Sequence, residues 1–394
     1  MDRILINRGG RGLLRRTCPV CGRKNEEQKK YFYRDFEGYK EIAPFSSYNV
    51  YACPECGMIY AGDMVESMPL NEYYNKMSRY DGDTYVLSPK IKSFYERETE
   101  FISKYVDKSS SILDIGCAFG GLLHELQMHG YSKVEGLELS EKNASYAKDH
   151  YGINVHIGGI GYGTVLDGKY DLVILSCTLE HIFDICGCVD EIKSFLNDNG
   201  KIFFAVPAVE DFTSHEDLYQ EFSTEHINYF TFASLINMMK KFGMRLIDKK
   251  IDRYDLMGLS GNSFTIWEKG ETESQTVDFK GIDDYMAQCS ELEKSVRLVF
   301  KRRDYPKGFY IWGAGTQTAM LYQLDVFPDS AVREIVDSNK NYTGEIIYGH
   351  QIKSPDALKM LPELPVLISS AYAEKAITEV IHKMKLKNEI WTLK

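Results

Sequence analysis

Ser111-Ile112-Leu113-Asp114-Ile115-Gly116-Cys117-Ala118-Phe119-Gly120 is the stretch that decides the fold, because an apolar strand pattern runs directly into a glycine-rich turn. Small residues at positions 116, 118 and 120 let a ligand approach the backbone. The next strand pattern ends in Glu138, where a carboxylate is placed to accept hydrogen bonds from both ribose hydroxyls. The turn and the acidic residue together predict a site for a nucleotide-type cofactor.

Strand and helix patterns alternate on both sides of this turn. Apolar spacing typical of a helix begins at Ile91, and Thr231 is expected to cap a later helix that Gly243 ends. The alternation indicates an α/β fold with a doubly wound parallel sheet, whose last two strands form an antiparallel edge. We place this domain at residues 89–270. The expected strands are 111–116, 133–139, 153–157, 170–176, 201–207, 244–252 and 262–269, and the expected helices are 121–130, 141–152, 188–196 and 232–242.

Two Cys-Pro-x-Cys-Gly turns mark the N-terminal segment, 1–88. Cys18 and Cys21 form the first pair, and Cys53 and Cys56 form the second. Four thiolates make a closed tetrahedral site without a position for substrate, so we expect a zinc-ribbon domain with structural Zn²⁺. Two disulfides or a rubredoxin-type iron are the alternatives. Between its cysteines this segment shows no long helical pattern, and we expect it to bury little by itself.

The last predicted domain spans residues 271–394. It begins with a polar linker at 269–281 and a helix expected to reach about Arg303, and a second, smaller strand and helix alternation follows. A strand pattern then leads into Gly313-Ala314-Gly315-Thr316, another glycine turn at the start of a helix. We predict a Rossmann-like domain whose turn either holds phosphates on backbone amides or only packs.

The net charge of the chain limits the classes of partner that it is expected to bind. The net charge is −10 and the pI is near 5.5, so the surface repels a polyphosphate backbone and nucleic acid is disfavoured. The basic first 17 residues lack an apolar core of signal-peptide length, and no stretch approaches the roughly 20 apolar residues of a membrane span. We expect a cytoplasmic protein with a small-molecule substrate.

The acidic start of the glycine turn separates two cofactor classes. A pyrophosphate does not suit a neighbouring carboxylate, whereas S-adenosylmethionine (SAM) presents an ammonium group there. Order and spacing over residues 111–206, including Leu179-Glu180-His181 after the fourth strand, resemble the class I SAM methyltransferases. The resemblance implies that the cofactor contacts Asp114, Gly116, Ala118, Gly120, Glu138, Ser176 and Cys177, with the 158–160 backbone, including Ile160, beside the adenine.

The stretch Tyr219 to Thr231 follows the last parallel strand and contains Glu225-His226, a general-base pair by its residue types. The chain as a whole resembles the three-domain sugar C-methyltransferases, which combine a four-cysteine zinc domain, a SAM domain and a Rossmann-like domain. Those enzymes remove the proton beside the ketone of a nucleotide-linked 4-keto sugar and methylate the carbon.

This resemblance assigns roles to particular residues. It makes His226 the base and lets Glu225 orient it or bind a sugar hydroxyl. The residues implied beside them are Tyr80, with Tyr74 and Tyr85 behind it, and Tyr229 as catalytic tyrosines, and Tyr219, Asn228, Gly313, Gly315 and Thr316 for the substrate. The family has a tyrosine three residues before the histidine, where this chain has Ser223.

Three other functions compete with this hypothesis. An O-methyltransferase acting on a sugar or glycan hydroxyl would use the same His226. An RNA base methyltransferase fits the zinc module but not the acidic charge. A non-catalytic SAM-binding scaffold explains the fold but makes no use of the Glu225-His226 pair. The Glu225-His226 pair also has a purely structural explanation, in which its side chains only fix the loop through local hydrogen bonds.

Overall fold

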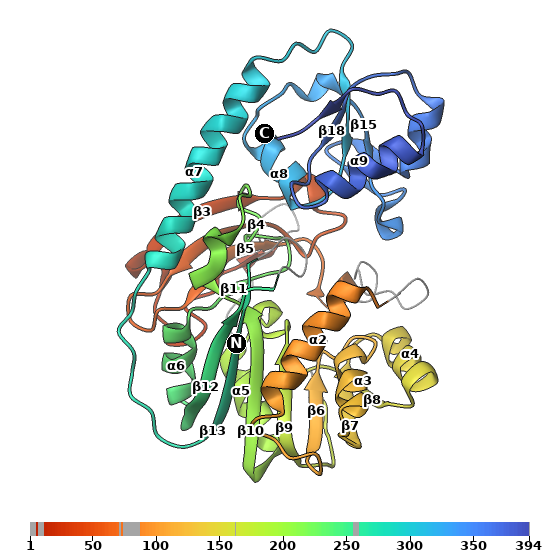
Figure 1. Cartoon of the computed structure of the whole chain (residues 1–394). Coiled ribbons are helices and arrows are strands. Elements are labelled where there is room, and N and C mark those ends of the chain that lie inside the picture. Colours follow the sequence, from red (N-terminus) through yellow and green to blue (C-terminus); the bar gives the residue numbers. More distant parts are fainter. Residues whose placement is uncertain are drawn as a thin grey trace.

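The computed structural model describes residues 5–6, 12–70, 72–73, 87–161, 163–254 and 260–393. Its described strands form three sheets, and Figure 1 shows the N-terminal sheet lying between two α/β units. The predicted Tyr80 and its alternatives Tyr74 and Tyr85 lie outside the described residues.

The central sheet has seven strands in the order β12-β13-β10-β9-β6-β7-β8. Strands β6 to β10 are parallel, and β13 pairs antiparallel with both β10 and β12. The order reverses between β6 and β9, and ligands bind beyond the carboxyl ends of strands at such a point. The strands are β6 (Ser111–Ile115), β7 (Lys133–Glu138), β8 (Asn154–Ile157), β9 (Tyr170–Ser176), β10 (Leu196–Pro207), β12 (Met244–Asp252) and β13 (Asn262–Lys269).

Side-chain caps set where several helices of this unit begin. Ser88, Ser140 and Thr231 each accept a hydrogen bond from a backbone N–H of the first turn, which satisfies a donor that the helix leaves unpaired. Asp184 does the same, so one helix begins three residues before the expected Cys188. The helices are α2 (Pro89–Ile102), α3 (Gly121–Met128), α4 (Glu141–Tyr151), α5 (Ile185–Phe195) and α6 (Phe232–Lys240).

The N-terminal segment forms a sheet of its own in the order β1-β2-β5-β4-β3. Its β5 also pairs with β11 (Asn228–Tyr229), a strand far downstream in the sequence. Tyr48 and Val50 are fully buried, but the cluster that buries them also contains residues of both α/β units, so the segment does not bury them by itself. The strands are β1 (Leu5–Ile6), β2 (Gly12–Leu14), β3 (Lys29–Asp35), β4 (Phe45–Ala52) and β5 (Ile59–Glu66).

The C-terminal unit follows the long helix α7 (Lys280–Lys301), which runs beside the N-terminal sheet toward it in Figure 1. Its sheet has the order β16-β17-β15-β14-β18-β19, parallel except for β16. The elements are β14 (Phe309–Trp312), α8 (Thr316–Gln323), β15 (Val332–Val336), β16 (Ile346–Ile347), β17 (His350–Lys353), β18 (Val366–Ile368), α9 (Glu374–Lys383) and β19 (Ile390–Trp391).

One apolar core crosses all three predicted segments. Tyr48 of the N-terminal sheet, Phe212 of the central unit and Ile311 of the C-terminal sheet belong to the same buried cluster. The N-terminal sheet therefore lies between the two α/β units, and both units pack against it. Among the described residues, no helix is both long and apolar enough to cross a membrane.

Candidate active site

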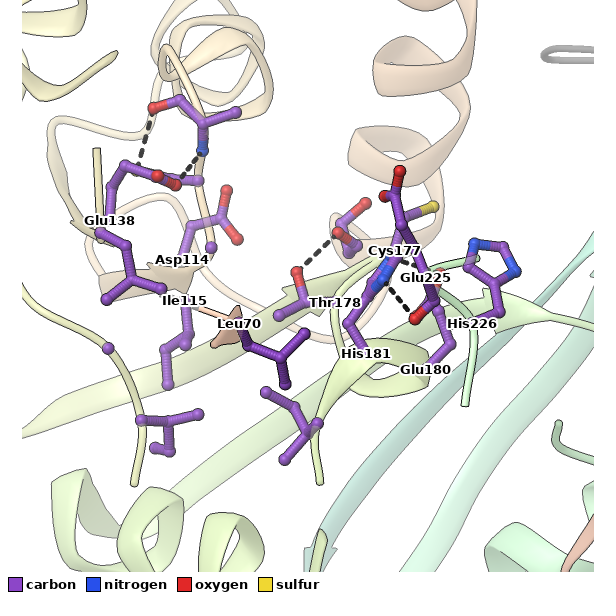
Figure 2. Close-up of a pocket in the computed structure, with 18 of the residues that line it drawn as sticks. Leu70, Asp114, Ile115, Glu138, Cys177, Thr178, Glu180, His181, Glu225 and His226 are labelled. Atoms are coloured by element: carbon purple, nitrogen blue, oxygen red, sulfur yellow. Dashed lines mark hydrogen bonds and ion pairs between the residues drawn. The ribbon is translucent and has the colours of Figure 1, made fainter. Parts of the chain in front are cut away.

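A cavity of about 480 Å³ opens at the carboxyl ends of the central parallel strands, a volume in the usual range for a small-molecule site. Figure 2 shows Asp114 and Glu138 on one side of it and Glu180, His181, Glu225 and His226 on the other. The two sides combine the predicted cofactor turn with the predicted general-base loop.

The glycine turn adopts the backbone conformation that its small residues allow. Gly116, Ala118 and Gly120 have φ values of 75°, 46° and 78°. A Cβ atom at Gly116 would lie 2.7 Å from Thr178 Oγ1, so a larger residue has no room there. Gly116 and Ala118 line the cavity, while Gly120 lies behind them as the N-cap of α3. The turn thus leaves a shallow cradle for a ligand.

Glu138 is fixed by the turn that it faces. Its Oε2 accepts a hydrogen bond of 3.0 Å from Ala118 N, and its Oε1 accepts one of 2.9 Å from Ser140 N. Burial raises the pKa of the Glu138 carboxyl, and these two backbone bonds oppose the shift. The carboxylate is held at the cavity wall with lone pairs remaining for ribose hydroxyls.

Asp114 is the carboxyl group of this turn best suited to hold a cationic group. The residue is 2% exposed, lines the cavity, and its Oδ1 has no hydrogen-bond partner among the described residues. Burial, followed by the neighbouring charge of Glu138, raises the pKa of Asp114 well above its usual value. A buried carboxyl oxygen without a partner costs free energy unless a ligand supplies one. The ammonium group of SAM fits this requirement.

The remaining predicted cofactor residues also reach the cavity. Ser176, Cys177 and Ile160 line it, as do Gly158 and Gly159. Ser176 Oγ donates to Glu98 Oε1 at 2.6 Å, and Cys177 has a φ of 49° at the turn after β9. Sequence reasoning missed Asn143 and Thr178, which line the same wall without belonging to a recognised motif.

Two histidines meet at the opposite wall. The His181 and His226 rings lie with centroids 4.9 Å apart and nearly perpendicular. His181 Nδ1–H donates to Glu225 O at 3.2 Å, which leaves its Nε2 as the acceptor nitrogen. Burial lowers the pKa of His181, so the neutral ring is favoured. Glu225 Oε1 accepts a hydrogen bond of 2.5 Å from Tyr73, a buried tyrosine that the sequence analysis did not select.

Glu180 adds a carboxyl group beside this pair. It is 1% exposed, lines the cavity, and in the part of the chain that the structure describes its Oε2 has no hydrogen-bond partner. Burial raises the pKa of Glu180 to about 8. Ligand atoms of Glu180, His181 and His226 all lie within 4.8 Å of one another. The wall can therefore accept and release protons near neutral pH.

Three residues predicted to act beside His226 have side chains that make their contacts outside the cavity. The Tyr229 hydroxyl donates to His226 O at 2.8 Å, and Tyr229 is not among the lining residues. The Tyr219 ring stacks on Phe32 at 4.2 Å. Asn228 Nδ2 donates to carbonyls of the loop after β9. The structure places these side chains behind the loop that carries Glu225 and His226.

The glycine turn of the C-terminal unit reaches the cavity through one residue. Thr316, the first residue of α8, lines it, whereas Gly313 and Gly315 do not. Arg34 joins this turn to the general-base loop, because its Nη2 donates to Thr316 O at 2.8 Å and its Nε to Phe222 O at 2.9 Å. The C-terminal unit therefore completes one end of the cavity.

The four N-terminal cysteines converge as predicted from their spacing. Cys18 Sγ lies 3.4 Å from Cys56 Sγ, Cys21 Sγ lies 3.4 Å from Cys53 Sγ, and all four sulfurs lie within 4.8 Å of one another. Tetrahedral bonds of about 2.3 Å place two sulfurs about 3.8 Å apart, close to these values. All nine cysteines are free, so the disulfide alternative is wrong.

Comparison with known proteins agrees with this geometry. A family model described as a methyltransferase domain matches residues 89–249. Residues 89–249 form a class I SAM-dependent methyltransferase domain. The match begins with α2 and ends within β12, so it covers both walls of the cavity.

Curated relatives cover the methyltransferase domain in part. A ubiquinone biosynthesis O-methyltransferase from Bordetella avium is 30% identical over 100 residues, 24% of this chain and 41% of the relative. A ribosomal protein L11 methyltransferase from Lactobacillus johnsonii is 26% identical over 102 residues, 25% of this chain and 31% of the relative. The chain thus spans well under half the length of either protein. Magnesium protoporphyrin IX methyltransferase from Synechocystis, solved with bound SAH, aligns with a TM-score of 0.40 and 15% identity over 51% of this chain and 98% of its own.

Proposed function

We propose that this chain transfers a methyl group from SAM to the carbon beside the ketone of a nucleotide-linked 4-keto sugar. One observation carries the proposal. A single cavity is lined by the SAM turn, by the Glu225-His226 loop and by Thr316 of the C-terminal turn. A donor, a base and a distant anchor for the acceptor therefore share one space.

The side of the cavity that carries Asp114 and Glu138, here called the donor wall, suits the charges of SAM. Asp114 offers an unpartnered oxygen to the ammonium group, and Glu138 offers a fixed carboxylate to the ribose. Methyl transfer is an in-line displacement, so this wall contributes by orienting the methyl group toward the acceptor. SAM supplies the electrophilic methyl carbon when it is bound.

The opposite side, which carries His181 and His226 and is here called the acceptor wall, supplies the proton chemistry. In this proposal the His226 imidazole takes the proton from the carbon next to the ketone. The enolate carbon then bonds to the methyl carbon while the sulfur–methyl bond breaks and S-adenosylhomocysteine (SAH) leaves. Glu225, held by Tyr73, orients His226 or binds a sugar hydroxyl. The neutral His181 beside it is a second group that exchanges protons.

The charge of the lining residues supports an anchor outside the methyl-transfer region. Among the described residues that line the cavity, five are carboxylic acids and none is lysine or arginine. A diphosphate is repelled by such a wall. The backbone amides at the start of α8, beside Thr316, are the better place for it, since helix N-termini bind phosphates.

An O-methyltransferase acting on a sugar or glycan hydroxyl is the second candidate. Ser223 stands where the sugar C-methyltransferases have a tyrosine, and its Oγ accepts from Glu225 N at 3.3 Å and His226 N at 3.1 Å. The hydroxyl therefore caps the loop. The ubiquinone biosynthesis relatives are named as O-methyltransferases. An RNA base methyltransferase is disfavoured by the net charge of −10, and a non-catalytic scaffold leaves the histidine wall unexplained.

We also propose that the four-cysteine site holds structural zinc. The distances between sulfurs fit a closed tetrahedral site, and a metal would hold together the turns at Cys18 and Cys53. Nine free cysteines suit a reducing compartment, and we propose the cytoplasm.

Mass spectrometry of the purified protein with SAM and a panel of nucleotide sugars tests the proposed reaction. Methyl gain confined to 4-keto sugars supports carbon methylation, and it is expected to come with loss of one solvent-exchangeable carbon-bound hydrogen. Gain on hydroxyl sugars alone supports the O-methyltransferase. Absence of gain on every sugar refutes both.

A further inference from the structure

The guanidinium of Arg16 lies at the back of the histidine wall and comes from the N-terminal segment, two residues before Cys18. It is 4% exposed, and among the described residues its five hydrogen bonds, all from Nη1 and Nη2, go to backbone carbonyls and an amide oxygen, while Nε has no partner there. Burying a charge is costly unless hydrogen bonds compensate for the lost hydration. Its contacts must therefore account for its position.

Those contacts join the two loops that carry the histidines. Nη2 donates to Phe183 O at 2.7 Å and to Ile182 O at 3.3 Å, in the loop that contains His181. Nη1 donates to Ile227 O at 2.9 Å, directly after His226. A planar fork with donors in fixed directions can bridge two backbones in this way, whereas a lysine ammonium lacks that shape.

Asn228 closes the same network. Its Oδ1 accepts from Arg16 Nη2 at 2.7 Å, and its Nδ2 donates to Ile182 O at 2.7 Å and Leu179 O at 3.1 Å. Ile227 N also donates to Glu180 O at 2.9 Å. The two loops are thus joined by one buried arginine and one buried asparagine in addition to this backbone hydrogen bond.

The four-cysteine turn fixes where Arg16 can reach. Cys186 Sγ donates to Pro19 O at 3.2 Å, which seats the first cysteine turn on the start of α5. The guanidinium lies over the Phe183 ring at 5.1 Å.

We propose that Arg16 is a positioning residue for the reaction, which holds His181 and His226 in register from behind the cavity. The N-terminal segment then shapes the acceptor wall as well as stabilising the fold. This inference rests on the proposed function for its kinetic consequence but not for its structural one.

Chemical rescue provides the test. Arg16→Ala is expected to lower kcat about 100-fold, the loss that a displacement of about 1 Å can cause. Affinity for SAH should stay within about threefold, since Arg16 does not line the donor wall. Added guanidinium should restore much of kcat, and ethylammonium should not. Arg23→Ala, which removes an exposed ion pair of the same segment, is the matched control.

A measurement that needs no methyl acceptor distinguishes failure of the Arg16 proposal from failure of the proposed function. Nitrogen NMR of the histidine rings should show one fixed tautomer for His181 in the wild type and averaged signals in Arg16→Lys. If no acceptor is methylated but the NMR change occurs, the proposed function fails and the positioning role stands. Unchanged histidine signals in a folded Arg16→Lys, or an Arg16→Ala kcat equal to wild type, overturns the positioning role.

Discussion

Replacing Asp114 by asparagine tests the donor wall directly. The substitution keeps the shape of a side chain buried between Gly136 and Ile174 in the sheet but removes its charge. A hydrogen bond to a charged group contributes about 1.5–3 kcal/mol. Since 1.4 kcal/mol corresponds to a tenfold change in Kd, SAH should bind about 10- to 100-fold more weakly. The unliganded variant should be no less stable, because it buries no ionisable carboxyl.

The pH dependence gives a second, independent readout. In the free protein the raised pKa keeps a proton on Asp114 in more of the molecules. The ammonium of the ligand favours the carboxylate, so binding releases that proton and affinity rises with pH until the free carboxyl is ionised. Isothermal titration calorimetry of SAH in two buffers with different ionisation enthalpies measures the proton count, which should fall in the variant.

Asp171→Asn is the matched control, because this carboxylate lies at the opposite end of the same sheet and accepts from Ser111 N. Its affinity for SAH should equal that of the wild type. A folded Asp114→Asn that binds SAH within threefold of wild type, with the same proton release, refutes the assignment of the ammonium to this carboxyl.

Three further outcomes are expected. His226→Asn should abolish methyl transfer while SAH affinity, measured by calorimetry, stays within about fivefold, and equal loss of both contradicts its role as base. Cys18→Ser should lose the single zinc ion expected per chain by elemental analysis and lower the unfolding midpoint, whereas a metal-free wild type contradicts the zinc proposal. Burial, with the charge of Asp217, raises the pKa of Glu221 to about 8. Its stabilising contribution is therefore complete at low pH and decreases as pH rises toward 8, by about 1.4 kcal/mol per pKa unit. Urea unfolding of Glu221→Gln should show a smaller loss of stability between pH 5 and pH 9, and an unchanged slope contradicts this account.

The central fold could be predicted closely because strand patterns and helix patterns alternate regularly along this part of the chain, between polar or glycine boundaries. The strands at 170–176, 244–252 and 262–269 have the expected limits. The N-terminal sheet could not be predicted in the same way. Its β3 and β4 are rich in tyrosine, and its β5 pairs with β11, which lies more than 150 residues away in the sequence.

The cofactor wall could be predicted from the sequence and the acceptor wall could not. The reason is that strand ends place residues together, whereas positions along a loop do not. Asp114 and Glu138 end consecutive strands, so local pattern and parallel topology place them together. Tyr219 and Tyr229 were chosen because they lie near His226 in sequence. Neighbours along a loop point in different directions, however, and these two rings pack into the core behind it.

The distribution of contacts explains why a methyltransferase domain alone would give an incomplete acceptor wall. The donor wall is made by β6, β7 and β9 of the matched domain. The histidine loops of that domain are joined from behind by Arg16 of the N-terminal segment, and the same cavity ends at Thr316 of the C-terminal unit. Arg34, also from the N-terminal sheet, connects the C-terminal turn to Phe222 in the general-base loop. Substitutions at these two arginines should therefore change acceptor turnover far more than SAH affinity, whereas substitutions at Asp114 should do the reverse.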